Sequence, residues 1–134
     1  MRIHRAQRLL ALALLAATLL PAGALAADAA PKVLSVITVK VNGSRHAYLE
    51  KIKTYQAISK RLGLPAARIW RGTLAGTATD QIFIAVEYEN LAAFAAAQTK
   101  LLADADAAKF TSDMDASGMR TVLDRSLFVD DTPQ

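Results

Sequence analysis

Two segments of the chain have the pattern of a β-strand, in which successive side chains point to opposite faces. Residues 33–41 (VLSVITVKV) are also rich in β-branched side chains, which favour strands. Residues 81–88 (QIFIAVEY) are apolar on both faces. One face would carry Ile82, Ile84, Val86 and Tyr88, and the other would carry Phe83 and Ala85. A strand of this kind needs cover on both sides of its sheet.

Apolar residues spaced three and four positions apart predict two helices. The first follows the turn at Asn42 and Gly43, with Ser44 as its N-cap. Gly63 and Pro65 end this helix, because glycine supplies the left-handed position after a helix and proline cannot continue one.

The second helix is expected to begin near Asn90 and to run to about Ala103. The acidic stretch 104–106 (DAD) is expected to interrupt it. A further turn or two should follow before Gly118 ends the helical segment.

The remaining segments complete the order β-α-β-β-α-β. Residues 68–75 (RIWRGTLA) predict a second strand, and residues 121–129 (TVLDRSLFV) predict the last. This order is typical of the ferredoxin-like α+β fold, in which an antiparallel four-stranded sheet carries two helices on one face. The first and third strands then lie in the middle. Each of these carries one charged residue, whereas the outer strands carry Arg68, Arg71, Asp124 and Arg125.

The first 26 residues have the pattern of a secretory signal peptide. Arg2, Arg5 and Arg8 precede an apolar run that ends at Pro21, and residues 24–26 (ALA) form a cleavage site of small residues. The run is short for a membrane span, so a cleaved signal is favoured over an uncleaved anchor. We predict a periplasmic or secreted protein that keeps no membrane segment after cleavage. The predicted layout is a signal peptide at 1–26, a disordered lead-in at 27–32, one domain at 33–129 and a polar tail at 130–134.

Removal of the signal peptide changes the charge of the protein. The full chain has 16 Lys and Arg and a formal net charge of +4. Without the three arginines of the signal, 13 Lys and Arg face 12 Asp and Glu, which leaves +1. No basic cluster remains that would follow a phosphate backbone, so nucleic acid is not an expected partner. The absence of cysteine excludes disulfides, cysteine nucleophiles and thiolate metal sites.

The second apolar face of the sheet predicts a partner. Two helices cover one face, and the predicted domain is too short to supply a third layer for the other. A large apolar face left in water is uncommon in soluble proteins. We therefore predict a homodimer in which two sheets face each other. Both faces of residues 81–88 are apolar, so either could be the paired one.

Three segments resemble the dimeric α/β-barrel superfamily: VEYENLAAFAAA, LGLP and DADAAKF. The resemblance covers nearly all of residues 33–129 and implies sheets that pair into a barrel. The superfamily includes antibiotic-biosynthesis and haem-degrading monooxygenases, muconolactone-isomerase-like enzymes, stress-responsive barrels and small domains without known activity. Haem degradation is not expected here. The histidine that such members carry on the second helix is missing from residues 91–117, and Glu87 and Tyr88 stand where they have tryptophan.

Four residues are candidates for a ligand site in this arrangement. Trp70 and Tyr55 could hold an aromatic ring, while Arg71 and His46 could contact polar groups. The alternative is that Tyr55 packs in the core and that His46 faces solvent. The chain has no recognisable catalytic, dinucleotide or metal-binding motif, so we predict no catalytic residue, no cofactor and no metal.

The sequence favours a module that binds a small apolar or aromatic molecule, or that serves in an interaction, over an enzyme. The alternative is a cofactor-free monooxygenase or isomerase acting on an aromatic or polycyclic substrate. In that case Trp70 and Tyr55 would surround the rings, and His46 or Arg71 would polarise an oxygen. Such an enzyme requires an enclosed pocket that holds Trp70 together with a group able to move a proton.

Overall fold

The two strands that the sequence predicts to be central lie in the middle of an antiparallel sheet. They are β1 (Val33–Val41) and β3 (Ile82–Tyr88). The outer strands are β2 (Arg68–Arg71), which pairs with β3, and β4 (Arg120–Val129), which pairs with β1. The computed structural model describes residues 30–133, so the predicted signal peptide and most of the lead-in lie outside the described residues.

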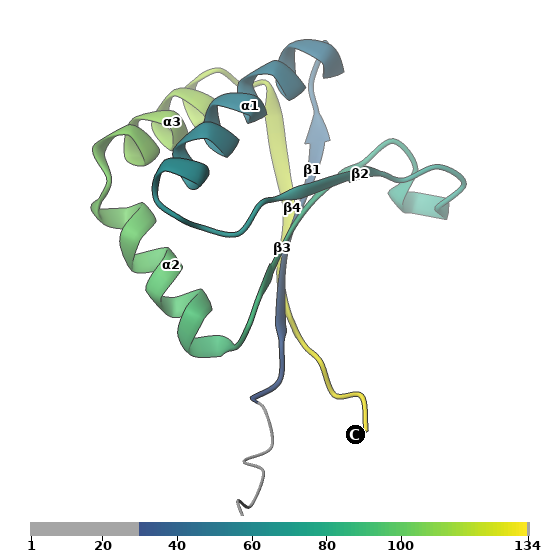
Figure 1. Ribbon diagram of the computed structural model, residues 1–134. Coiled ribbons are helices and arrows are strands. Elements are labelled where there is room, and N and C mark those ends of the chain that lie inside the picture. The colour runs from purple at the N-terminus through teal and green to yellow at the C-terminus, as the bar shows by residue number, and fades with distance from the viewer. Residues whose placement is uncertain (1–29, 134) are drawn as a thin grey trace, which may run out of the picture.

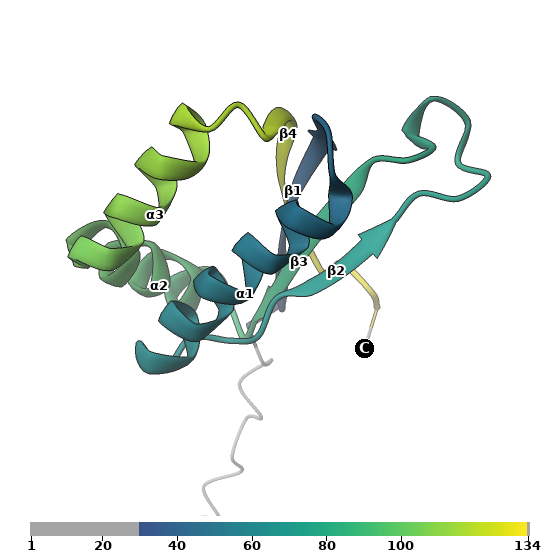
Figure 2. The same ribbon diagram turned by 90° about the horizontal axis from the view of Figure 1, so that it is seen from above.

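Three helices form a single layer on one face of this sheet (Figure 1). They are α1 (Arg45–Arg61), α2 (Leu91–Ala103) and α3 (Ala105–Ala116). The view from above shows these helices on one side of the sheet (Figure 2), and within residues 30–133 the other side carries no α-helix. The predicted ferredoxin-like α+β fold is therefore confirmed.

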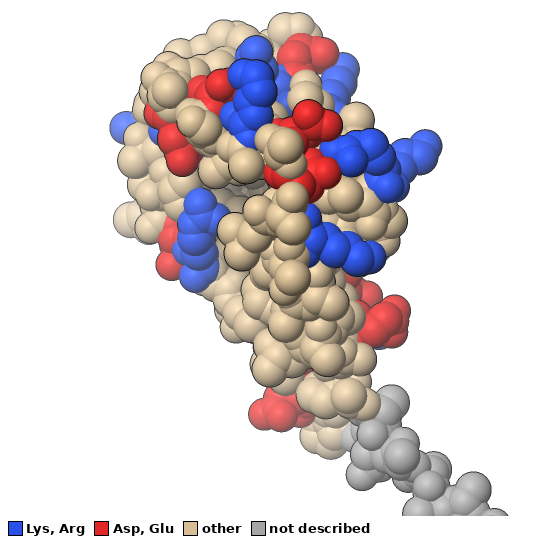
Figure 3. Space-filling model, turned by 90° about the vertical axis from the view of Figure 1, so that its left-hand side faces the viewer, with Lys and Arg blue, Asp and Glu red and all other residues tan. Residues whose placement is uncertain are grey.

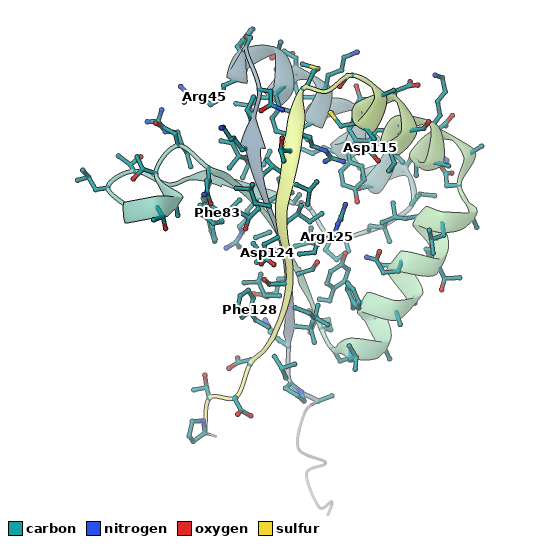
Figure 4. The ribbon with its side chains drawn as sticks, turned by 180° about the vertical axis from the view of Figure 1, so that it is seen from behind. Arg45, Phe83, Asp115, Asp124, Arg125 and Phe128 are labelled. Carbon is teal, nitrogen blue, oxygen red and sulfur yellow. The ribbon has the colours of Figure 1, made fainter. Side chains whose placement is uncertain are left out.

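Strand pairing assigns a face to every position of the two central strands. Ile82 and Ile84 pack with Tyr48 of α1, so their row faces the helices. Phe83 and Phe128 point to the opposite side (Figure 4). We call that side the open face. Its apolar residues, assigned from alternation and register, are Leu34, Val36, Trp70, Phe83, Ala85 and Phe128.

The core lies where α1 and α3 meet the sheet. Tyr48 and Ile52 of α1 are buried against Val39, Ile82 and Met114. The spacing of four between the two α1 residues places them on one side of the helix, as the sequence predicts. Burial of large apolar side chains of this kind contributes roughly 1.5–3 kcal/mol each.

The predicted second helix is two helices, because Asp104 ends one and begins the next. The Ala107 amide donates to Asp104 Oδ1 at 2.9 Å, which makes this aspartate the N-cap of α3. The segment after the break is twelve residues long, more than the turn or two expected from the sequence. Arg61, at the end of α1, donates to both Asp104 carboxylate oxygens at 2.9 and 3.0 Å. The break is thus a junction between all three helices.

This junction should make the stability of the protein depend on pH in the acid range. The Arg61 guanidinium, and then the Ala107 amide, lower the pKa of Asp104 below its ordinary value. Because the pKa of Asp104 is lower in the folded than in the unfolded protein, its ionised carboxylate stabilises the fold at pH values above the unfolded pKa of about 3.9. This stabilisation is lost as the pH falls through the folded pKa. We expect Asp104→Asn, which can still cap α3, to unfold at lower urea concentration than the wild type at pH 7. The gap should narrow as the pH falls through the folded pKa of Asp104.

Urea midpoints measured from pH 7 to pH 2.5 test this expectation, with Asp131→Asn in the exposed tail as control. The control should match the wild type at each pH. A gap between Asp104→Asn and the wild type that persists unchanged at pH 2.5 would contradict a role for the ionised carboxylate.

The second strand is shorter than predicted and ends at Arg71 instead of Ala75. Gly72 causes the early end. Its amide donates to the Gln81 carbonyl at 2.9 Å, and a Cβ at this position would collide with the carbonyl oxygen of Ala78. Only glycine therefore fits where the chain leaves the strand.

Residues 72–81 form a projecting turn that extends away from the body on the side of the open face (Figure 1). A 3-10 helix, η1 (Gly76–Ala78), closes it. Leu74 within this turn has a φ of 56° and is 97% exposed. A leucine held in the left-handed region and in water is unusual, because its Cβ disfavours that conformation.

Candidate functional site

A cavity of about 660 Å³ lies between the helix side of the sheet and the helices. Its floor comes from β1, β3 and β4, and its walls come from all three helices. Two aromatic pairs line it. Tyr55 and Phe110 lie with ring centroids 5.5 Å apart, and Tyr88 meets Phe94 edge to face at 5.4 Å. The other apolar lining residues include Ile37, Ile52, Ile84, Val86, Leu101 and Leu127.

The cavity owes part of its room to Ser35 on the central strand. This serine lies on the helix side of β1, between Val33 and Ile37, and its neighbours on the adjacent strands are Val86 and Leu127. Its side chain is the smallest of this row, where the sequence otherwise places branched apolar residues. A larger side chain here would rise into the cavity.

The polar end of the cavity is formed by Arg120 and Arg125 of β4 and Asp115 of α3. The side chain of Arg120 is 8% exposed, and its Nη2 donates to Asp115 Oδ1 at 3.3 Å. Arg125 has its side chain on the helix side of the sheet, whereas that of Asp124 lies on the open face (Figure 4). Within residues 30–133, Arg125 has no carboxylate within ion-pair distance.

An irregularity in β4 turns both arginines to the same side. Arg120 pairs with Val41 and Arg125 pairs with Ile37, with a bulge opposite Thr38 and Val39. The two arginines are five positions apart and would face opposite sides of a regular strand. The extra residue of the bulge shifts the alternation by one position, so both side chains lie on the helix side of the sheet.

Beside the cavity, two buried polar atoms lack partners in the described part of the chain. They are the hydroxyl of Tyr48, which is fully buried, and Nε of Arg120. Burial raises the pKa of the Tyr48 hydroxyl, and the nearby Arg120 guanidinium opposes that rise. An unpaired buried polar group is costly, and a bound polar atom is one way to satisfy it.

The four residues predicted to form a ligand site do not come together. Tyr55 lines the cavity. Trp70 lies on the open face, opposite Phe83, and is 53% exposed. Arg71 is exposed at the end of β2, and His46 is exposed in the first turn of α1. The sequence did not single out Ser35, Phe110 or Arg120 as lining residues, and Arg120 lies just before the strand predicted at 121–129.

A second hollow of about 510 Å³ lies between α1 and α3. Four of its charged residues form two ion pairs, Arg61 with Asp106 at 3.0 Å and Lys109 with Asp113 at 2.7 Å, whereas Lys51 has no ion-pair partner within residues 30–133. Figure 3 shows these charges over the upper part of the helix side, while the lower part, over α2, is mostly uncharged. Since two ion pairs account for four of these five charges, only that of Lys51 is left for a ligand here.

The described residues contain no cluster of three or more His, Asp or Glu side chains placed to hold a metal ion. No helix among them is both long and apolar enough to cross a bilayer.

Comparison with known proteins finds no matching sequence family and no similar curated protein. Solved structures share the fold. One is a conserved protein of unknown function from Bacteroides thetaiotaomicron, a possible oxidoreductase, with TM-score 0.53 at 18% identity over 74% of this chain and 97% of its own. A NIPSNAP-like domain protein from Burkholderia xenovorans has TM-score 0.54 at 10% identity, covering 77% of this chain and 90% of its own. A NIPSNAP family protein from Agrobacterium tumefaciens has TM-score 0.54 at 14% identity, covering 78% and 91%.

At these identities the likeness establishes the ferredoxin-like fold and no activity. Membership of the dimeric α/β-barrel superfamily stays a prediction from the sequence.

Proposed function

We propose that this protein binds a small apolar or aromatic molecule in the cavity between its sheet and its helices. The observation that supports this most is the cavity itself: about 660 Å³, lined by two aromatic pairs, with polar groups gathered at one end. Concave, mostly apolar spaces of ~300–1,000 Å³ with a few polar groups are typical of small-molecule sites.

Binding without catalysis is the proposal, because no histidine of residues 30–133 lines the cavity. Asp115 is the acidic lining residue, and it is paired with Arg120. His46 lines neither of the two hollows, and Trp70 is on the other face of the sheet. The alternative of a monooxygenase or isomerase needs Trp70 and a proton-moving group in one enclosed pocket.

We also propose that two copies associate through their open faces. The open face is apolar at its centre and carries opposite charges at its two edges, with Arg68 on β2 and Asp124 on β4. A surface with both signs of charge can complement a second copy of itself. The projecting turn, with exposed Leu74, extends on the same side and would flank a sheet docked there.

Export to the periplasm or the exterior completes the proposal and is supported by the pattern of residues 1–26 and the lack of cysteine. Native mass spectrometry of the protein recovered from its own compartment tests all three parts in one spectrum. We expect a chain that lacks residues 1–26, a dimer mass, and a small molecule released at higher collision energy. A full-length, ligand-free monomer would overturn the proposal.

Filling the cavity should abolish binding. In Ser35→Phe the ring would project from the floor into the ligand space, whereas Ser35→Ala leaves the room unchanged and removes only the hydroxyl. We expect the affinity for the neutral fluorescent probe N-phenyl-1-naphthylamine to fall about tenfold or more in Ser35→Phe, from the loss of apolar contact area, and to be retained in Ser35→Ala.

Probe titrations are paired with circular dichroism, which should show the same fold for all three proteins. If a folded Ser35→Phe binds the probe as tightly as the wild type, the cavity is not the site.

A further inference from the structure

Two arginines lie at the polar end of the proposed ligand site. Arg120 is at the inner end, with its side chain 8% exposed, and Arg125 is exposed at the edge of the sheet. The bulge in β4 places both on the helix side of the sheet, although their spacing of five would separate them on a regular strand. The strand irregularity thus gathers positive charge on the cavity.

Residues 30–133 do not balance the positive charge at this end of the cavity. Asp115 is the carboxylate of the cavity lining, and it is engaged by Arg120, whose Nε still has no partner among the described residues. Arg125 has no acidic partner within residues 30–133, since Asp124 beside it lies on the open face. Guanidinium groups next to apolar surface are strong donors to a carboxylate, because they bind it in a planar, charge-assisted geometry.

We infer that the ligand is an amphiphilic anion, of the class of aromatic or medium-chain carboxylic acids. Its carboxylate would bind between Arg125 and Arg120, and its apolar body would lie against the floor at Ser35 and the aromatic pairs. This inference rests on the proposed function and adds the charge of the ligand to it. Arg125 is the determinant of specificity, since Arg120 already has Asp115 as a partner.

Octanoate and 1-octanol test this inference, since they share an apolar chain and differ in the charge of the head group. Each competes with N-phenyl-1-naphthylamine for the wild-type protein, Arg125→Gln and Arg45→Gln. Arg45 is exposed at the start of α1, lines neither hollow and provides a control of equal charge change.

We expect the wild type and Arg45→Gln to bind octanoate about tenfold more tightly than octanol, the factor that one charge-assisted hydrogen bond supplies. In Arg125→Gln the two ligands should bind alike, with the affinity for octanol unchanged. Because Arg125 is exposed, its replacement should leave the fold intact.

Equal affinity for octanoate and octanol in the wild type would overturn the anion preference and leave the proposed apolar site standing. A preference for octanoate that is lost equally in Arg45→Gln and Arg125→Gln would also overturn it, since it would then reflect net charge. If neither the probe nor either competitor binds, the proposed function fails and this inference fails with it.

Discussion

Replacing Phe83 with arginine is expected to convert the proposed dimer into a monomer. Phe83 lies at the centre of the open face, on β3, with Trp70 beside it on β2 and Thr38 beside it on β1. In a dimer of facing sheets an arginine there would be buried without a partner for its charge. Burial of an unpaired charge costs several kcal/mol, so the dissociation constant should rise at least about 100-fold. Sedimentation velocity of residues 27–134 at micromolar concentration measures the change.

Leu91→Arg is the matched control for this experiment. Leu91 is also apolar and exposed, at 57%, but it begins α2 on the helix side of the molecule. This variant should sediment as the wild type does. A wild-type protein that is monomeric at micromolar concentration, or a Phe83→Arg variant that remains dimeric, would contradict association through the open face.

The sheet could be predicted from the sequence because its signals are local. Short apolar runs at residues 33–41 and 81–88 identify the central strands, and the caps at Ser44 and Asn90 fix where α1 and α2 begin. Alternation could not decide which face of β3 meets the helices, since both faces are apolar. That choice depends on the packing of Ile82 and Ile84 against helices distant in the sequence.

The cavity could not be predicted, because it is a property of packing between distant segments. Its polar end depends on the bulge in β4, and periodicity alone would place Arg120 and Arg125 on opposite sides of the strand. Its floor depends on a single small residue, Ser35. The room that this residue leaves can be recognised only once Val86 and Leu127 are known to lie beside it. Aromatic composition drew attention to Trp70, but pairing places that residue on the open face. The local sequence pattern thus predicts the helices and strands, while the position of the site depends on how the strands pair.

Two substitutions at Tyr48 should separate the contribution of its ring to stability from that of its hydroxyl. Its ring is fully buried among Ile52, Ile82 and Met114, so Tyr48→Ala removes a large apolar group and leaves a cavity. We expect a loss of roughly 3–5 kcal/mol in the free energy of unfolding, the range for aromatic-to-alanine changes in cores.

Tyr48→Phe keeps the ring and removes a hydroxyl that has no hydrogen-bond partner in the described residues. Burying a hydroxyl without a hydrogen bond costs free energy, because the group loses its bonds to water. This variant should therefore be as stable as the wild type or more stable, by up to about 1 kcal/mol. Equilibrium unfolding in urea at neutral pH measures both changes. A loss of more than about 1 kcal/mol in Tyr48→Phe would mean that the hydroxyl bonds to Arg120 in solution.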